Sequence, residues 1–270
     1  MQGNKITIKA PAKINLFLQL LNKRIDGYHN INSGITFIDL YDEIEIKKSN
    51  SLKINYTGPF KPSKGFYKDC IIKKIVEILP FDKKINLDIS INKNIPVQGG
   101  LGSASSNAVG FIKGLQKLKI IKLNRSFPYT YYFGADIESF LFGKSCIVKG
   151  IGDKVIPFKF PKYFVLLVKP KVNFSTQIMY SKLKIQIKSN IKLKKKYLKN
   201  DFENIAKNKS KEIIDILHYL RNLDNIIFAN LTGSGSCCYA VFKKRNFAEQ
   251  AQHKFNKNFP NLWTYVGENL

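Results

Sequence analysis

Pro96 to Ser106, P-V-Q-G-G-L-G-S-A-S-S, stands near the middle of the 270-residue chain between two differently patterned segments. On its N-terminal side, Ile85 to Ile91 alternates apolar and polar residues, which is the period of a half-buried strand. On its C-terminal side, Ala108 to Leu118 carries apolar residues at three- and four-residue spacing, which is typical of one face of a helix. The sequence therefore predicts a strand, a glycine loop and a helix in that order.

The beginning of such a helix can hold an anion, because its first N–H groups are unpaired and the helix dipole is positive there. The glycines of the loop let the backbone approach a ligand closely, and its serines add hydroxyl groups. The loop lacks the lysine that ends a P-loop, and its spacing differs from the dinucleotide-binding G-x-G-x-x-G. By itself the stretch indicates a phosphate site or, equally, an ordinary turn with a serine at the helix start.

Composition places the chain among globular proteins, with 44% hydrophobic and 24% charged residues. Its length allows one large domain or two modest ones. No apolar run is long enough to cross a membrane, and Met1 to Ala10 lacks the apolar centre of a signal peptide. The four cysteines show neither metal-ligand spacing nor a disulfide framework. We therefore expect a cytoplasmic protein with no membrane partner.

The formal net charge of +26 is a feature shared with many proteins that bind nucleic acids. Lysine is nevertheless spread along the whole chain together with many asparagines and isoleucines, and only Lys192 to Lys199 forms a dense cluster. This distribution indicates a biased composition more than a binding surface, and a positive potential equally favours a phosphorylated small molecule. A nucleic-acid partner is therefore not expected.

A second motif lies near the N-terminus, where Pro11 to Leu16 reads P-A-K-I-N-L. The pattern predicts a strand on which Lys13 and Asn15 share one face. Two polar side chains placed in this way can bind one ligand together, or can simply face solvent.

Two further segments contain residues suited to binding or catalysis. Asp26 to His29, D-G-Y-H, is a turn signal followed by two rings that can stack on and hydrogen-bond a heterocyclic base, or complete a loop without any ligand. Residues 134–141, G-A-D-I-E-S-F-L, place Asp136 among small and apolar neighbours. This carboxylate is suited to be a general base or a metal ligand, or to cap the helix that follows it.

The rest of the chain follows the same two patterns, with a second glycine- and serine-rich turn, L-T-G-S-G-S-C, beginning at Leu231 and leading into a strand. Pro11 is expected to interrupt the first strand. Strands are predicted over residues 5–10, 11–20, 35–46, 51–56, 143–153, 163–169 and 263–266, and helices over 67–79, 202–220 and 246–259 and from Ser175 onward.

The three motifs P-A-K-I-N-L, P-V-Q-G-G-L-G-S-A-S-S and L-T-G-S-G-S-C, in this order, resemble the three signatures of the GHMP kinases. Within that superfamily the chain is most similar to the kinases that act on cytidylated methylerythritol in the non-mevalonate route to isoprenoids. This finer likeness rests on D-G-Y-H, on G-A-D-I-x-x-F-L, on N-D-F-E at Asn200 to Glu203, and on the ending G-E-N-L. It extends over nearly the whole chain.

The resemblance implies an α+β, two-domain GHMP kinase fold with the active site in the cleft between the halves. Residues 1–155 would form a ribosomal-S5-domain-2-like, ATP-binding N-terminal domain. Residues 156–270 would form a ferredoxin-like α/β sandwich on the substrate side. A small-molecule kinase, monomeric or homodimeric, that uses ATP with Mg²⁺ is the activity implied.

The resemblance also implies roles for individual residues. Asp136 would take the proton from the 2-hydroxyl of the substrate, while Lys13 would lower the pKa of that hydroxyl and stabilise charge. Substrate contacts are implied for Asn15, Tyr28, His29, Ile151, Thr176 and Tyr180. ATP contacts are implied for Lys93, Pro96, Gly99, Gly100, Leu101, Gly102, Ser103, Ala104, Ser105 and Ser106. Gly233 to Gly235 would close against this loop, and the metal ligands are not assigned.

The chain departs from the pattern of its relatives at a few positions. Gln98 replaces a glycine, Ser103 and Ala104 stand where more glycine is usual, and Glu138 replaces a proline. Two other functions stay open at this stage: a GHMP kinase for homoserine, mevalonate or a sugar, and a non-catalytic basic protein that holds RNA on the same fold.

Overall fold

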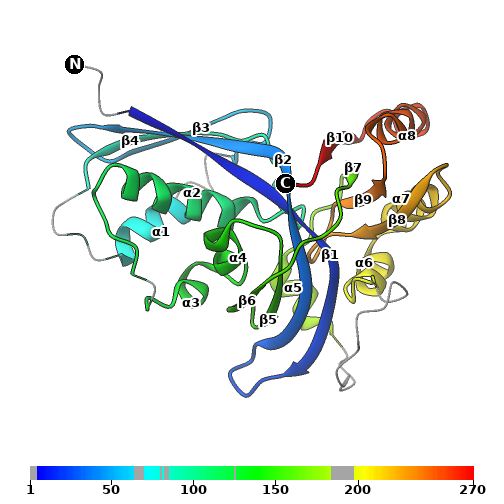
Figure 1. Cartoon of the computed structure of the whole chain (residues 1–270), viewed down its shortest axis with the longest axis horizontal. Coiled ribbons are helices and arrows are strands. Elements are labelled where there is room, and N and C mark those ends of the chain that lie inside the picture. The colour runs from blue at the N-terminus through cyan, green and yellow to red at the C-terminus, as the bar shows by residue number, and fades with distance from the viewer. Residues whose placement is uncertain (1–4, 64–69, 80, 82–84, 125, 184–197) are drawn as a thin grey trace.

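Two long antiparallel strands, β1 (Lys5–Lys23) and β2 (His29–Lys48), form the frame of the molecule (Figure 1). The structure is a computed structural model and describes residues 5–63, 70–79, 81, 85–124, 126–183 and 198–270. Apolar residues line β1 from Ile14 to Leu20 and are buried on both of its faces. Such burial on two sides requires a second layer of structure next to the strand.

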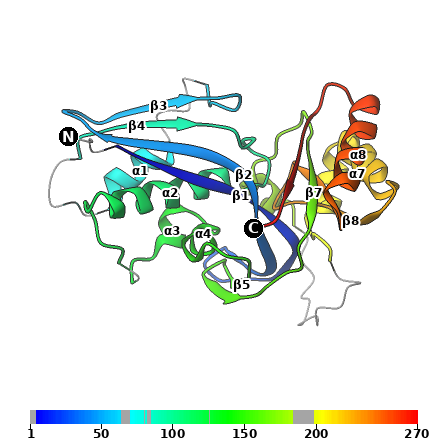
Figure 2. The same ribbon diagram turned by 45° about the horizontal axis from the view of Figure 1, so that its top comes forward.

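The first sheet has the order β3-β4-β2-β5-β6, with β1 paired to β2. Its β3 and β4 are parallel and the other pairs are antiparallel. The helices α1 to α4 lie on one face of this sheet (Figures 1 and 2). The bounds are β3 (Lys53–Thr57), α1 (Ile71–Ile78), β4 (Leu87–Asn92), α2 (Ser103–Lys117), α3 (Tyr129–Phe133), α4 (Ile137–Phe142), β5 (Cys146–Gly150) and β6 (Lys154–Pro157).

The second sheet is antiparallel throughout and has the order β10-β7-β9-β8. It lies on the opposite side of the molecule from α1 to α4, and α6 to α8 accompany it (Figure 2). The bounds are β7 (Phe164–Lys169), α5 (Thr176–Ser181), α6 (Glu203–Lys209), α7 (Lys211–Arg221), β8 (Ile226–Leu231), β9 (Cys238–Phe242), α8 (Arg245–Asn258) and β10 (Trp263–Glu268). The predicted α+β class is confirmed.

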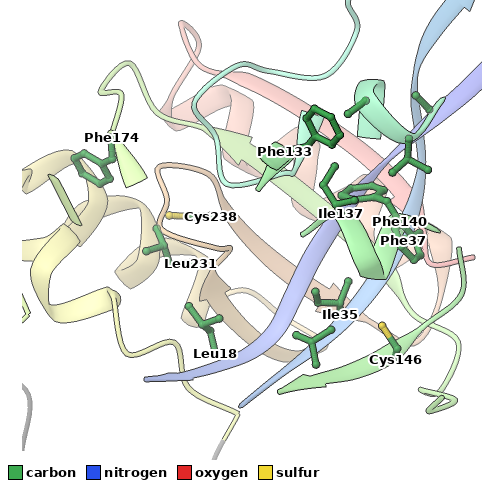
Figure 3. Packing of buried hydrophobic residues seen from close by; sticks show 14 of the residues in the cluster. Leu18, Ile35, Phe37, Phe133, Ile137, Phe140, Cys146, Phe174, Leu231 and Cys238 are labelled. Carbon is green, nitrogen blue, oxygen red and sulfur yellow. The ribbon is translucent and has the colours of Figure 1, made fainter. Parts of the chain in front are cut away.

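The two sheets share their hydrophobic core along β1. Ile14 and Leu16 pack in one buried cluster with Tyr239 of the second sheet. Leu18 belongs to a cluster that includes Leu231 of β8 (Figure 3). The phenol of Tyr239 also donates a hydrogen bond to the carbonyl of Asn15, at 2.9 Å. Because β1 is packed on both sides, the polar side chains that it carries are held at the junction of the two halves.

Helix α2 approaches the first sheet closely because two of its positions lack a side chain. A Cβ on Gly114 would lie 2.4 Å from Cδ1 of Ile46, and one on Gly110 would lie 2.8 Å from Cδ1 of Ile44. A methyl group at either position would require these isoleucine side chains to move, so both glycines favour the close approach of the helix to β1 and β2.

The strand and the helix predicted on either side of the glycine loop are confirmed as β4 and α2. The interruption expected at Pro11 is wrong: β1 continues through it, with a register shift between Pro11 and Ala12 that accommodates the missing N–H. The single helix expected over residues 202–220 is two helices, because Ser210 is extended, with φ −153° and ψ 119°. The start of the helix expected from Tyr67 and most of the Lys192 to Lys199 cluster lie outside the described residues.

Candidate active site

Lys13 and Asp136 meet at the junction of the two halves. The ammonium of Lys13 lies 3.2 Å from Oδ2 of Asp136 and donates a hydrogen bond to Oδ1 of Asn15, at 2.5 Å. The side chain of Lys13 is 3% exposed and that of Asp136 is 31% exposed. Lys13 and Asn15 share a strand face as predicted, and this face is turned toward the site rather than toward solvent.

Asp136 occupies the N-cap position of α4, but its side chain makes no capping hydrogen bond. The carboxylate pairs with Lys13 instead, and Ser139 donates a hydrogen bond to the Asp136 backbone carbonyl, at 2.7 Å. The cap alternative raised by the sequence is therefore wrong, and the carboxylate is available at the mouth of the site.

The glycine loop connects β4 to α2 and lies against Lys13. The N–H of Lys13 donates to the carbonyl of Leu101, at 3.0 Å. Gly100 and Gly102 both have a φ of 72°, a left-handed conformation that favours glycine. A Cβ on Gly102 would lie 2.8 Å from the ring of Phe140 and 2.9 Å from Cγ of Lys13. The backbone of the loop thus passes directly beside the Lys13 and Asp136 pair.

The turn between β8 and β9 packs on this loop, as predicted for Gly233 to Gly235. The N–H of Cys237 donates to the carbonyl of Gly99, at 3.1 Å. The hydroxyl of Thr232 accepts from the N–H of Asn15, at 3.1 Å, and donates to the carbonyl of Gly100, at 3.3 Å. Thr232, which sequence reasoning missed, therefore ties β1, the glycine loop and the second sheet together.

Lys93 is buried and does not face the loop as a free cation. Its ammonium donates to Asp42 of β2 and to the hydroxyl of Ser103, and that hydroxyl donates to Asp42 at 2.9 Å. Burial lowers the pKa of Lys93, while the charge of Asp42 and its hydrogen bond oppose that shift. Asp42 was missed by the sequence analysis, because it is one of several acidic residues along β2 and nothing in the pattern singles it out.

The serines of the loop differ in what their hydroxyls do. Ser106 donates to the carbonyl of Pro11, at 2.7 Å, and Ser103 donates to Asp42. Ser105 lies beside Gly134, where a built Cβ would be 3.7 Å from its hydroxyl oxygen. Among the contacts of the described residues, the Ser105 hydroxyl has no hydrogen bond, so it is the serine placed to serve a ligand.

His29 of β2 and Tyr180 of α5 stack, with ring centroids 5.4 Å apart and planes 30° apart. Burial, followed by the charge of Asp136, raises the pKa of Tyr180 strongly, so its phenol stays protonated. Burial and the nearby Lys23 lower the pKa of His29, which favours the neutral imidazole. Thr176 is also in this region, with its hydroxyl 2.9 Å from that of Ser234.

Tyr28 is 45% exposed and meets the edge of Tyr131, with centroids 6.2 Å apart and planes at 83°. The turn before it is fixed by Asp26, which pairs with Arg24 at 2.8 Å and accepts the N–H of Tyr28 at 3.1 Å. Tyr131 comes from the tyrosine-rich stretch before Gly134, and the sequence analysis assigned it no role.

Ile151, another predicted site residue, is buried, and its N–H donates to Asp153 at 2.9 Å. At the departures from the family pattern, Gln98 has an exposed side chain and a φ of 51°. Glu138 accepts from the hydroxyl of Thr130 at 3.5 Å, and burial raises its pKa. Neither side chain fills the glycine loop.

Asn200 of the N-D-F-E motif is a further residue whose contacts explain its place. Its amide donates to the carbonyls of Leu231 and Gly233, each at 2.8 Å. The motif therefore supports the turn that covers the glycine loop, a role that only the tertiary contacts disclose.

Within the described residues, no three or more His, Cys, Asp and Glu side chains gather as a metal site. A magnesium ion needs few protein ligands when phosphates supply the rest. The hydroxyl oxygen of Ser105, which lies beside Gly134, can supply one such ligand. In the same part of the chain, no helix has the length and apolar character needed to span a bilayer.

Comparison with known proteins places this geometry in a family. The chain matches the GHMP kinases N terminal domain over residues 69–157 and the GHMP kinases C terminal domain over residues 183–261. It is 35% identical over 256 residues to the 4-diphosphocytidyl-2-C-methyl-D-erythritol kinase of Francisella tularensis subsp. tularensis (strain WY96-3418), covering 91% of this chain and 90% of the relative. The protein of the same name from Pelagibacter ubique (strain HTCC1062) is 35% identical over 277 residues, covering 96% and 97%.

A crystal structure of 4-(cytidine 5'-diphospho)-2C-methyl-D-erythritol kinase has the same fold, with a TM-score of 0.81 and 21% identity over 98% of this chain and 99% of that chain. The two-domain GHMP kinase fold expected from the motifs is thereby confirmed. The chain belongs to the GHMP kinases and, within them, to the family of 4-diphosphocytidyl-2-C-methyl-D-erythritol kinases.

Proposed function

We propose that this chain transfers the γ-phosphoryl group of ATP to the 2-hydroxyl of 4-diphosphocytidyl-2-C-methyl-D-erythritol. The observation that carries the proposal is the Lys13 and Asp136 pair, held beside a glycine loop at the N-terminus of α2. The likeness to relatives that bear this name supports the choice of substrate.

Asp136 acts on the hydroxyl of the substrate in this proposal. Of its two carboxylate oxygens, Oδ2 faces Lys13. The carboxylate can therefore accept the hydroxyl proton while Lys13 stabilises negative charge on the attacking oxygen. Phosphoryl transfer depends mainly on positioning and on neutralising oxygen charge, and this pair supplies both.

The glycine loop receives the ATP phosphates. In this proposal, backbone N–H groups at the start of α2 and the hydroxyl of Ser105 would donate hydrogen bonds to these phosphates. Lys93 and Ser103 both donate hydrogen bonds to Asp42, and in this proposal they support the loop that binds the phosphates. The proposed ATP contacts otherwise follow the family: Pro96, Gly99, Gly100, Leu101, Gly102, Ala104 and Ser106. Mg²⁺, with the Ser105 hydroxyl as a ligand from this chain, would supply charge neutralisation on the phosphate oxygens when bound.

The rings at the substrate side hold the cytosine. His29 and Tyr180 form a stacked pair, and Tyr28, which precedes His29 in the sequence, presents an exposed ring. Aromatic faces and a neutral imidazole suit a flat, hydrogen-bonding base. Asn15, Ile151 and Thr176 are assigned to the remainder of the substrate. The two domains are proposed to divide between residues 155 and 156, which lie within β6, the last strand of the first sheet along the chain.

One turnover experiment tests the function. ADP release is measured with Mg-ATP and, in parallel, 4-diphosphocytidyl-2-C-methyl-D-erythritol, homoserine, mevalonate or galactose. We expect turnover with the cytidylated alcohol alone. Turnover with one of the other alcohols, and none with the cytidylated alcohol, would show that the proposed substrate is wrong and would identify the correct one. Salt-sensitive RNA binding, with no thermal stabilisation by Mg-ATP, would favour the non-catalytic alternative.

A further inference from the structure

Asp42 is a fully buried carboxylate that lies close to the glycine loop but belongs to β2. Its Oδ1 accepts two backbone N–H groups, from Asn94 at 2.8 Å and from Ile95 at 2.9 Å. These residues come directly before Pro96, so this oxygen fixes the point at which the chain enters the loop.

The other oxygen of Asp42 fixes the point at which the chain leaves the loop. Oδ2 accepts from the Lys93 ammonium and, at 2.9 Å, from the hydroxyl of Ser103. Ser103 is the first residue of α2. One side chain from a distant strand therefore holds both ends of the loop, from Asn94 to Ser103.

The chemistry of Ser103 makes this arrangement specific. A hydroxyl has one proton, and Ser103 gives it to Asp42 while accepting a hydrogen bond from Lys93. Ser103 therefore has no proton left to donate to a phosphate oxygen. Ser103 and Lys93 instead connect Asp42 to the start of α2 by hydrogen bonds, so the position of Asp42 determines where the helix begins.

Buried charges are retained at such a site only when they are paired and hydrogen-bonded. Asp42 and Lys93 fulfil this condition, and their position next to the loop gives them a task besides stability. We propose that Asp42 is a positioning residue that sets the spacing of the two ends of the phosphate loop, through Lys93 and Ser103, for a nucleoside triphosphate. This inference rests on the proposed function, because it requires ATP at the loop.

The test uses variants that separate charge balance from positioning. Asp42→Asn retains an oxygen for Asn94 and Ile95 but turns an amide N–H₂ toward Lys93 and Ser103. Because that change leaves the buried Lys93 ammonium without its counter-charge, the double variant Asp42→Asn with Lys93→Met is made as well. The control is Asp39→Asn on the same strand, whose Oδ1 accepts the N–H of Glu268 at 2.8 Å, away from the loop.

Calorimetric titration gives the dissociation constant of Mg-ATP, and steady-state assays give the KM of the alcohol. We expect Mg-ATP binding to weaken about tenfold in the double variant while the KM of the alcohol changes less than about twofold. Thermal unfolding should show the double variant to be more stable than Asp42→Asn alone. Asp39→Asn should bind Mg-ATP as the wild type does.

Ser103→Ala leaves the Lys93 and Asp42 pair intact. It therefore tests the positioning role of Asp42 even if the other variants fold poorly. It should weaken Mg-ATP binding, and it should add little when combined with the double variant, because all three residues act as one unit. Unchanged Mg-ATP binding in Ser103→Ala, or effects that multiply in the triple variant, would overturn the inference. A wild type that neither binds Mg-ATP nor releases ADP would instead refute the proposed function.

Discussion

The ammonium of Lys13 on β1 lies 3.2 Å from the carboxylate of Asp136 at the start of α4, and the same ammonium contacts Asn15. These contacts join the first motif of the chain to a segment far along the sequence. Lys13 is almost completely buried, whereas Asp136 reaches the surface of the site. In the proposed reaction, an alcohol that approaches from solvent would meet this carboxylate before it reaches the buried ammonium.

Asp136→Asn should abolish turnover without unfolding the protein. The amide has nearly the same size but cannot accept the hydroxyl proton, so ADP release should fall by at least about a hundredfold. The protein should still fold, with a lower Tm, because the buried Lys13 ammonium loses the counter-charge that lies 3.2 Å from it. Turnover close to that of the wild type would refute the role of Asp136 as the base.

Gly100→Ala should destabilise the contact between the glycine loop and the second sheet. A Cβ at Gly100 would lie 2.2 Å from the carbonyl oxygen of Thr232, in addition to the strain of a φ of 72°. We expect a loss of at least about 2 kcal/mol in the free energy of unfolding. Gly27→Ala is the matched control, since Gly27 has a φ of 85° but no atom within 4 Å of a built Cβ. That variant should lose only about 1 kcal/mol, and equal losses in both would argue against a steric contact.

Gln98→Gly should be tolerated and should not weaken ATP binding. Gln98 has a φ of 51°, which glycine adopts without strain, and its side chain is exposed. The relief of about 1 kcal/mol is largely offset by the greater freedom of glycine in the unfolded chain. The free energies of unfolding of the variant and the wild type, measured in urea, should therefore agree within about 1 kcal/mol. A large gain in ATP affinity would show that Gln98 does crowd the loop.

Tyr131→Ala should weaken binding of the cytidylated substrate through Tyr28. The two rings meet edge to face, and such a contact is worth about 0.5–1.5 kcal/mol, so the KM should rise about twofold to thirteenfold at unchanged kcat. Tyr132→Ala is the control, because Tyr132 stacks on Phe127 instead. If both variants raise the KM equally, the effect belongs to the whole aromatic segment.

His29 should make the protein less stable at mildly acidic pH. Its pKa is lowered in the folded chain, first by burial and then by Lys23, from an ordinary value of 6.5. The unfolded chain therefore takes up the proton more readily, and the stability that the neutral ring contributes is present above pH 6.5 and lost as the pH falls toward the lowered pKa. Between about pH 7.5 and 5.5 the wild-type Tm should fall more than that of His29→Gln. Parallel curves for the wild type and His29→Gln would contradict the assignment.

Much of the local structure follows from the sequence. Period-two and period-three-to-four patterns identified β4, α2, β7, α8 and β10, because burial of one face imposes those periods. Errors arose where long-range contacts override local preference. At Pro11 the pairing of β1 with β2 carries the strand through the proline, and near Ser210 a break divides what the pattern predicted as one helix.

The motifs of the sequence determined the family and the residues to examine, because Lys13, Asp136 and the glycines stand in recognisable local patterns. Only the tertiary structure decided how these residues work together. Of the acidic residues of β2, Asp42 is the one that contacts the glycine loop. Ser103 and Ser106 donate their hydroxyls within the protein, whereas Ser105 remains available to a ligand. Thr232 joins β1 to the loop through its hydroxyl. The physical reason is that hydrogen bonds and buried charges are satisfied in space by residues far apart in the chain, and a local pattern contains no information about those partners.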